Sequence, residues 1–168
     1  MMARPGQADR AVIRCLRRIA IAGLAGGLAM IPVGLVLRFE FGQSVNFYGE
    51  LIVIRITGRL DPLLLAIEHG AVSLAMAALL VVTLDRLGHR AAPAVGLVYG
   101  GTAWFVVNSL VLPWIFDQPT PWQIGSQAIW GSLIVHLVFG LVVALVSRHL
   151  ARARSTPVRA LSGVGGGV

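Results

Sequence analysis

Four apolar stretches, each about as long as a membrane span, constrain this chain more than any other feature of its sequence. A helix needs roughly 20 predominantly apolar residues to cross the hydrocarbon core of a bilayer. Only 12% of the 168 residues are charged, so the chain lacks the polar surface that a soluble domain of this size requires. The sequence therefore predicts an all-α integral membrane four-helix bundle, with spans at residues 19–37, 63–84, 93–116 and 128–147.

The spans divide the chain into three regions. Residues 1–18 form a basic N-terminal segment, of which residues 9–18 could extend the first helix. Residues 19–147 form the transmembrane domain, and residues 148–168 form a basic tail that ends in a flexible glycine-rich sequence. The first apolar run is longer than the core of a signal peptide and no small-residue cleavage motif follows it, so we expect an uncleaved anchor.

The segment between the first two spans, residues 38–62, contains an apolar run that charged residues keep far below the length of a span. We expect a short interfacial helix here, with Asn46 as its N-cap. Arg55 and Arg59 are four residues apart and share one face of this helix. Two interpretations remain open: a solvated amphipathic linker, or a segment that covers the outer end of the bundle and offers an arginine to Glu68.

The placement of arginine predicts the orientation of the chain. All 14 basic residues are arginines, and most lie in the N-terminal segment, the loop at residues 85–92 and the C-terminal tail. Cytoplasmic segments are enriched in basic residues, so both termini are predicted to be cytoplasmic, and Trp114, Trp122 and Trp130 would form an aromatic belt at the outer interface. Abundant alanine, glycine and arginine without lysine is typical of a GC-rich bacterial genome. We therefore expect a multi-pass protein of the bacterial inner membrane, and we expect no nucleic acid as a partner.

Ionisable residues inside the spans indicate where a functional site would lie. Glu68 and His69 stand side by side in the second span, where such groups need protein partners, water or a ligand. The predicted helix directions place them at nearly the same depth as Asn108 and His136, about 8–12 Å below the outer edge. The predicted site comprises Glu68, His69, Asn108 and His136, with Arg55, Arg59, Ser73, Trp104 and Ser132 as supporting residues on shared faces.

Four interpretations of this polar layer remain open. The layer could organise the bundle through hydrogen bonds between helices. His69 and His136 could instead ligate a haem b axially, with Gly140 one turn from His136 leaving room for the ring. Glu68 with the two histidines could hold a divalent metal, although familiar ligand spacings are absent. Finally, Glu68 and the histidines could relay protons or line the path of a small solute in a transport component.

The motifs of soluble enzymes are absent from the sequence, which contains no P-loop, no G-x-S-x-G and no H-E-x-x-H. The single cysteine, Cys15, cannot form an intramolecular disulfide. Small residues four apart in the first span, such as Gly23 and Gly27, let a neighbouring helix approach closely, so this face could mediate a homo-oligomer or contact a membrane complex. We expect the lipid bilayer as the main partner, no resident cofactor, and a non-enzymatic accessory or stress-related role.

The second half of the chain resembles a known family. The sequence GLVYGGTAWFVVNSLVLPWIF is followed by PTPW and then by GSLIVHLVFGLVVAL, which contains Gly131, His136, Leu137 and Val138. Across residues 94–145 this pattern resembles the YagU-like, uncharacterised bacterial inner-membrane proteins. The resemblance implies a four-helix inner-membrane protein without an established catalytic activity.

Overall fold

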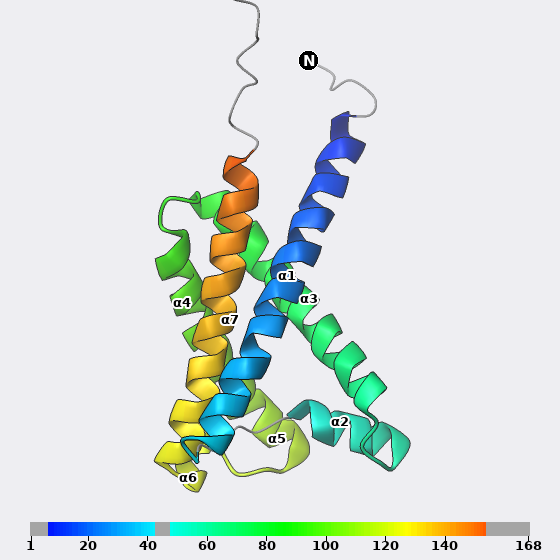
Figure 1. Ribbon diagram of the computed structural model, residues 1–168, viewed down its shortest axis with the longest axis vertical. Helices are drawn as coiled ribbons and strands as arrows, with labels where there is room; N and C mark the ends of the chain where they lie inside the picture. Colours follow the sequence, from blue (N-terminus) through cyan, green and yellow to red (C-terminus); the bar gives the residue numbers. More distant parts are fainter. Residues whose placement is uncertain (1–6, 43–47, 154–168) are drawn as a thin grey trace, which may run out of the picture.

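The computed structural model describes residues 7–42 and 48–153, and within these residues every regular element is a helix. The long helices are α1 (Gln7–Phe39), α3 (Pro62–Leu87) and α7 (Ser126–Arg152). Between α3 and α7 the chain forms α4 (Ala92–Ala103), η1 (Trp104–Val111) and α5 (Leu112–Phe116) in succession. Two short helices, α2 (Tyr48–Thr57) and α6 (Pro121–Ile124), lie at the end of the bundle opposite the start of α1 and the end of α7 (Figure 1).

The described residues contain four helical stretches that are long and apolar enough to cross a membrane, at Asp9–Phe39, Pro62–Leu87, Ala92–Phe116 and Ser126–Arg152. These stretches confirm the predicted all-α four-helix bundle of a multi-pass membrane protein. The helices are longer than the predicted spans, because α1 begins at Gln7 and α7 continues to Arg152. The glycine-rich end of the predicted tail and the predicted N-cap, Asn46, lie outside the described residues.

Glycines on α1 set its contacts with the other long helices. A Cβ atom added at Gly23 would lie 3.0 Å from the Cβ of Ala77 on α3, and one added at Gly26 would lie 3.0 Å from the Phe139 ring on α7. In lipid no hydrophobic effect drives helices together, so such close backbone approach supplies the packing. The face of α1 that carries Gly23 and Gly26 therefore packs within the chain, and its predicted role in a homo-oligomer or a membrane complex stays a prediction.

Helices α4 and α7 approach each other even more closely. A Cβ atom at Gly96 would lie 2.7 Å from the Cβ of Ala144, and one at Gly140 would lie 3.0 Å from the backbone nitrogen of Gly100. Distances this short allow only hydrogen at the glycine Cα positions. The structure thus assigns Gly140 to the contact with α4, which corrects the prediction that it leaves room for a haem.

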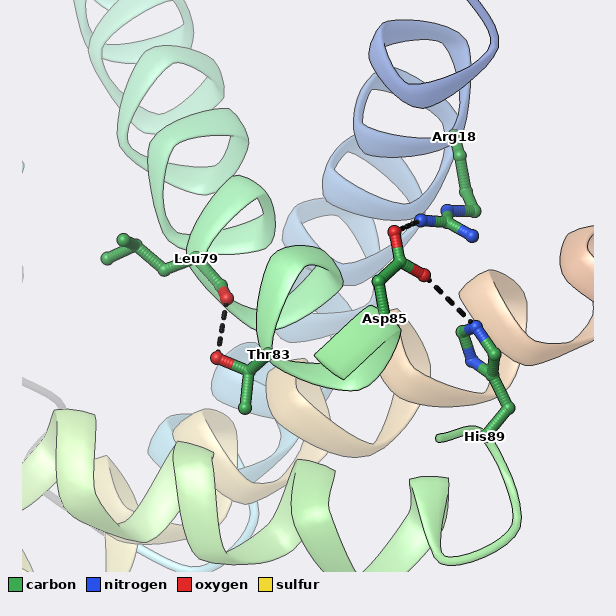
Figure 2. Close-up of polar contacts among 5 residues, drawn as sticks. All are labelled: Arg18, Leu79, Thr83, Asp85 and His89. Carbon is green, nitrogen blue, oxygen red and sulfur yellow. Dashed lines mark hydrogen bonds and ion pairs between the residues drawn. The ribbon is translucent and has the colours of Figure 1, made fainter. Parts of the chain in front are cut away.

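A polar cluster joins α1 to α3 near the end of the bundle that carries both chain ends. The carboxylate of Asp85 accepts a charged hydrogen bond from Arg18 on α1, and its other oxygen lies 3.1 Å from Nε2 of His89 (Figure 2). The side chain of Arg18 is buried, whereas that of Asp85 is 40% exposed. Beside this cluster lies an apolar core of small and branched residues, formed by Ala22, Ala77, Leu80, Val81, Leu84, Ala92, Phe139, Val143 and Ala144.

The third span changes its hydrogen-bond register at η1, where the backbone forms a π-helix. Pro113 has no N–H to donate to the carbonyl of Ser109, four residues earlier, and its ring would crowd that carbonyl. The N–H of Leu112 donates to the carbonyl of Val107, five residues back. The third span thus accommodates Pro113 by a wider helical turn, and the neighbouring residues Asn108 and Ser109 are both buried.

The predicted interfacial helix is α2, which lies across the end of the bundle (Figure 1). Its first residue, Tyr48, is buried and stacks on Phe116 at the end of the third span, with ring centroids 6.0 Å apart. Val53 is also buried. Of the two interpretations of this segment, the structure favours a segment packed against the bundle. The side chains of Arg55 and Arg59, however, are exposed.

Candidate functional site

A cavity of about 580 Å³ lies in the half of the bundle next to α2. Its walls come from the second half of α1, from α2, from the first half of α3, from Gly100 to Leu112, and from the first half of α7. Its volume falls within the range of small-molecule sites, which are mostly apolar with a few polar groups. The polar or titratable residues that line it are Tyr48, Glu50, Glu68, His69, Ser73, Asn108, Ser132 and His136.

All four residues of the predicted polar layer line this one cavity. Among the described residues, none of the four forms a hydrogen bond to another of the four. The polar layer is therefore not a closed network of side chains that satisfy each other. The groups instead surround a common space from three helical segments, α3, η1 and α7.

Asn108 presents an unsatisfied donor at the cavity wall. The residue is only 5% exposed, and its Nδ2 nitrogen has no hydrogen-bond partner among the described residues. A buried N–H without a partner costs about 1–3 kcal/mol, so such groups are uncommon in native structures. Because Asn108 lies in the π-helical segment, the wide turn at η1 is what holds this amide at the cavity.

The two histidines are each oriented by a backbone carbonyl. His69 uses Nε2 to reach the carbonyl oxygen of Gly27 on α1, at 3.1 Å, which a glycine at this crossing makes accessible. His136 uses Nδ1 to reach the carbonyl oxygen of Ser132, one turn earlier on α7, at 2.7 Å. Each imidazole therefore donates from one nitrogen, so in the neutral ring the other nitrogen is a free acceptor.

Two carboxylates line the cavity, Glu68 on α3 and Glu50 on α2. Neither has an ion-pair or hydrogen-bond partner among the described residues. Gly49 lies directly against the carboxylate of Glu68, where a Cβ atom would overlap it, so the absence of a side chain at residue 49 leaves room for this carboxylate. Glu50 was not predicted as a site residue, because it lies in the segment between the first two spans, where charged residues usually face water.

The predicted supporting residues divide into two groups. Ser73 and Ser132 line the cavity, and Trp104 donates from Nε1 to Oγ of Ser132 at 2.8 Å. Arg55 and Arg59 are exposed and do not line the cavity, so the hypothesis that this segment offers an arginine to Glu68 is not realised in the structure.

The geometry does not fit the two cofactor alternatives. Axial ligation by both imidazoles would require Nε2 of His69 to leave the Gly27 carbonyl, and the space beside Gly140 is filled by α4. Within the described part of the chain, no three His, Cys, Asp or Glu side chains lie close enough to hold a metal ion. The hypothesis that Glu68, His69 and His136 hold a divalent metal is therefore wrong.

A scan against protein-family models and searches of curated proteins and of solved structures found no match to the chain. The resemblance to the YagU-like proteins stays a prediction. The functional argument therefore rests on the chemistry of the cavity itself.

Proposed function

We propose that this chain is a small bacterial inner-membrane protein, with both termini in the cytoplasm, that binds a lipophilic small molecule in the cavity beside α2. The observation that carries the proposal is the convergence of Glu68, His69, Asn108 and His136 on one space without pairing to one another. Groups that only organise a bundle satisfy each other across helices, whereas these leave a donor and several acceptors for a molecule between them. The role is that of a binding or accessory component rather than an enzyme.

The opposite half of the bundle supports binding over transport. Beyond the cavity, towards the chain ends, Leu80, Leu84 and Val143 are fully buried and the Arg18–Asp85 contact joins α1 to α3. A passage through the protein would have to open both the apolar core and this ion pair. The proton-linked transport alternative therefore requires a second conformation, while binding requires only the arrangement described here.

The test fills the cavity with a side chain. Gly34 lines the cavity and is buried, and a Cβ atom added there meets only Val135, at an ordinary 3.6 Å. Gly34→Leu should therefore fold and place its isobutyl group in the cavity. Gly70→Leu is the matched control, because Gly70 is also helical, does not line the cavity and has no atom within 4 Å of an added Cβ.

Equilibrium dialysis of detergent-purified protein would use three probes of similar shape: tetraphenylphosphonium, tetraphenylborate and uncharged triphenylphosphine oxide. We expect at least one probe to bind the native chain and the Gly70→Leu variant equally and to bind Gly34→Leu about tenfold or more weakly, a loss of about 1.4 kcal/mol or more. The same detergent in every sample cancels partition into micelles. If no probe distinguishes Gly34→Leu from Gly70→Leu, the cavity does not bind lipophilic molecules and the proposal fails.

A further inference from the structure

The charges around the cavity are the reverse of those on the rest of the chain. The protein carries a formal net charge of +7 from 14 arginines and 7 acidic residues. The cavity is nevertheless lined by two of the three glutamates, Glu50 and Glu68, and by none of the arginines in the described residues. The site is therefore an acidic pocket in a strongly basic protein.

Because Glu50 lies on α2 and Glu68 on α3, the pocket takes its acidity from two separate elements that meet only in the folded bundle. An ionised carboxylate in apolar surroundings needs a counter-charge. The other titratable residues that line the cavity are Tyr48 on α2, His69 on α3 and His136 on α7, and each histidine already donates to a backbone carbonyl. No arginine of residues 7–42 or 48–153 lines the cavity beside these carboxylates, and the sequence contains no lysine.

The remaining wall suits the apolar body of a cation. Met30, Leu35, Val72, Met76 and Val135 contribute aliphatic or thioether surface. Tyr48 and Phe139 contribute aromatic rings, whose faces attract organic cations that have been removed from water.

Asn108 supplies a second and independent feature that points to a bound molecule. Its buried Nδ2 lines the same cavity without a partner, so it can donate to an oxygen or another acceptor atom on the molecule. The carboxylates and this amide come from three different elements, α2, α3 and η1.

From this arrangement we infer that the cavity binds a lipophilic organic cation, an amine or onium group with an apolar body and a hydrogen-bond acceptor, whose charge is balanced by Glu50 and Glu68. This inference rests on the proposed binding function and specifies its ligand class. An anionic molecule such as a fatty acid is disfavoured, because it would face both carboxylates without a basic group from the described residues. A neutral molecule would leave the two carboxylates without a counter-charge.

The glutamates of this chain provide a matched set for the test. Glu50→Gln and Glu68→Gln each remove one charge from the cavity while keeping the size of the side chain. Glu40→Gln makes the same change at an exposed position at the end of α1 that does not line the cavity. Size-exclusion elution and far-UV circular dichroism would verify that all three variants fold like the native chain.

The measurement compares tetraphenylphosphonium with tetraphenylborate, which have nearly the same shape and opposite charge. We expect the native chain and Glu40→Gln to bind the phosphonium equally, Glu50→Gln and Glu68→Gln to bind it about tenfold more weakly, and the borate to bind about 100-fold more weakly than the phosphonium. The inference would be overturned if the two ions bound equally, or if the borate or the neutral oxide bound more tightly than the phosphonium. It would also be overturned if Glu50→Gln and Glu68→Gln both kept the native affinity for the phosphonium. If a probe still binds in one of these cases and Gly34→Leu weakens that binding, the proposed binding function stands and only the ligand class is wrong. If no probe binds at all, the proposed function and the inferred ligand class are both refuted.

Discussion

Gly100 is the position where a single methyl group should test the packing that builds the cavity. A Cβ atom at Gly100 would lie 3.0 Å from the carbonyl carbon of His136 and 3.1 Å from the Cα of Leu137, and closer still to the carbonyl oxygen of His136. Ordinary van der Waals contact begins near 3.4 Å, so the carbonyl carbon alone would have to withdraw by about 0.4 Å, and the closer carbonyl oxygen requires the backbone of α7 to move farther. A helix backbone cannot rotate away as a side chain does, so the whole α4–α7 contact must loosen.

The expected cost of Gly100→Ala follows from this geometry. Overpacking a tight interior costs about 1–3 kcal/mol, and here the contact is with backbone, so we expect the upper part of that range. Gly101→Ala is the matched control, because its added Cβ would meet only a Leu137 methyl group at 3.8 Å. At that position alanine should be neutral or should stabilise the helix by about 0.5–1 kcal/mol.

Unfolding in mixed micelles of increasing sodium dodecyl sulfate content, followed by far-UV circular dichroism, measures both variants. Gly100→Ala should unfold at a clearly lower sodium dodecyl sulfate fraction than the native chain, and Gly101→Ala should not. Because the clash displaces His136, which lines the cavity, probe binding should weaken in Gly100→Ala alone. If the two alanine variants unfold together with the native chain, α4 and α7 are not in backbone contact and the reasoning is wrong.

Three further predictions concern other parts of the bundle. Arg18→Ala should lower the free energy of unfolding by about 1–3 kcal/mol, because Asp85 loses its partner on α1 but remains partly exposed to solvent. In the same titration, Arg17→Ala should change the free energy of unfolding by less than about 0.5 kcal/mol, because Arg17 is exposed. Equal effects of the two substitutions would contradict the buried contact between Arg18 and Asp85. Pro113→Ala restores an N–H that can donate to the carbonyl of Ser109, so η1 should return towards α-helical register, and probe binding should fall while the helix content stays unchanged. If this variant binds the probe with native affinity, the π-helix is not needed for the site. In a Cys15→Ser background, the cysteine of Arg59→Cys should react with a membrane-impermeant maleimide in intact cells, and the cysteine of Arg90→Cys should react only after permeabilisation. The reverse pattern of labelling would show that the orientation is opposite to the one proposed.

The fold could be predicted from the sequence because four apolar stretches of this length can cross a bilayer only as helices. Each predicted span lies inside an observed helical stretch, and the segment before Asp61 forms the expected short helix. Asp61 then begins α3 by accepting hydrogen bonds from the backbone nitrogens of Leu63 and Leu64, at 3.0 and 3.1 Å. These features depend on local chemistry, which a sequence displays directly.

The site was harder to predict, because its details depend on which helix faces meet. The depth of a residue along a helix follows from counting residues. Depth alone therefore predicted that Glu68, His69, Asn108 and His136 lie at one level of the bundle. Whether these groups pair or surround a space depends on helix separation, which is set by contacts such as Gly23 with Ala77 and Gly100 with the backbone of His136. The partner of Arg18 was missed for the same reason, since a basic residue before a span is usually an orientation signal, and only the crossing of α1 and α3 brings it to Asp85.

The cavity lies on one side of the close contact between α1 and α3. The half of α3 near the chain ends packs Ala77 against Gly23 of α1. The other half of α3 runs towards α2, and α1 and α3 diverge in that direction (Figure 1).

Helix α2 covers the resulting opening through Tyr48 and Gly49, and in doing so brings Glu50 to the space that Glu68 already faces. Replacing Gly49 with alanine should therefore displace the carboxylate of Glu68 and weaken cation binding while the contacts of α4 with α7 persist. Closure of the cavity and the placement of its second carboxylate thus depend on the same helix, so a ligand that pairs with Glu50 and Glu68 would also hold α2 against the bundle.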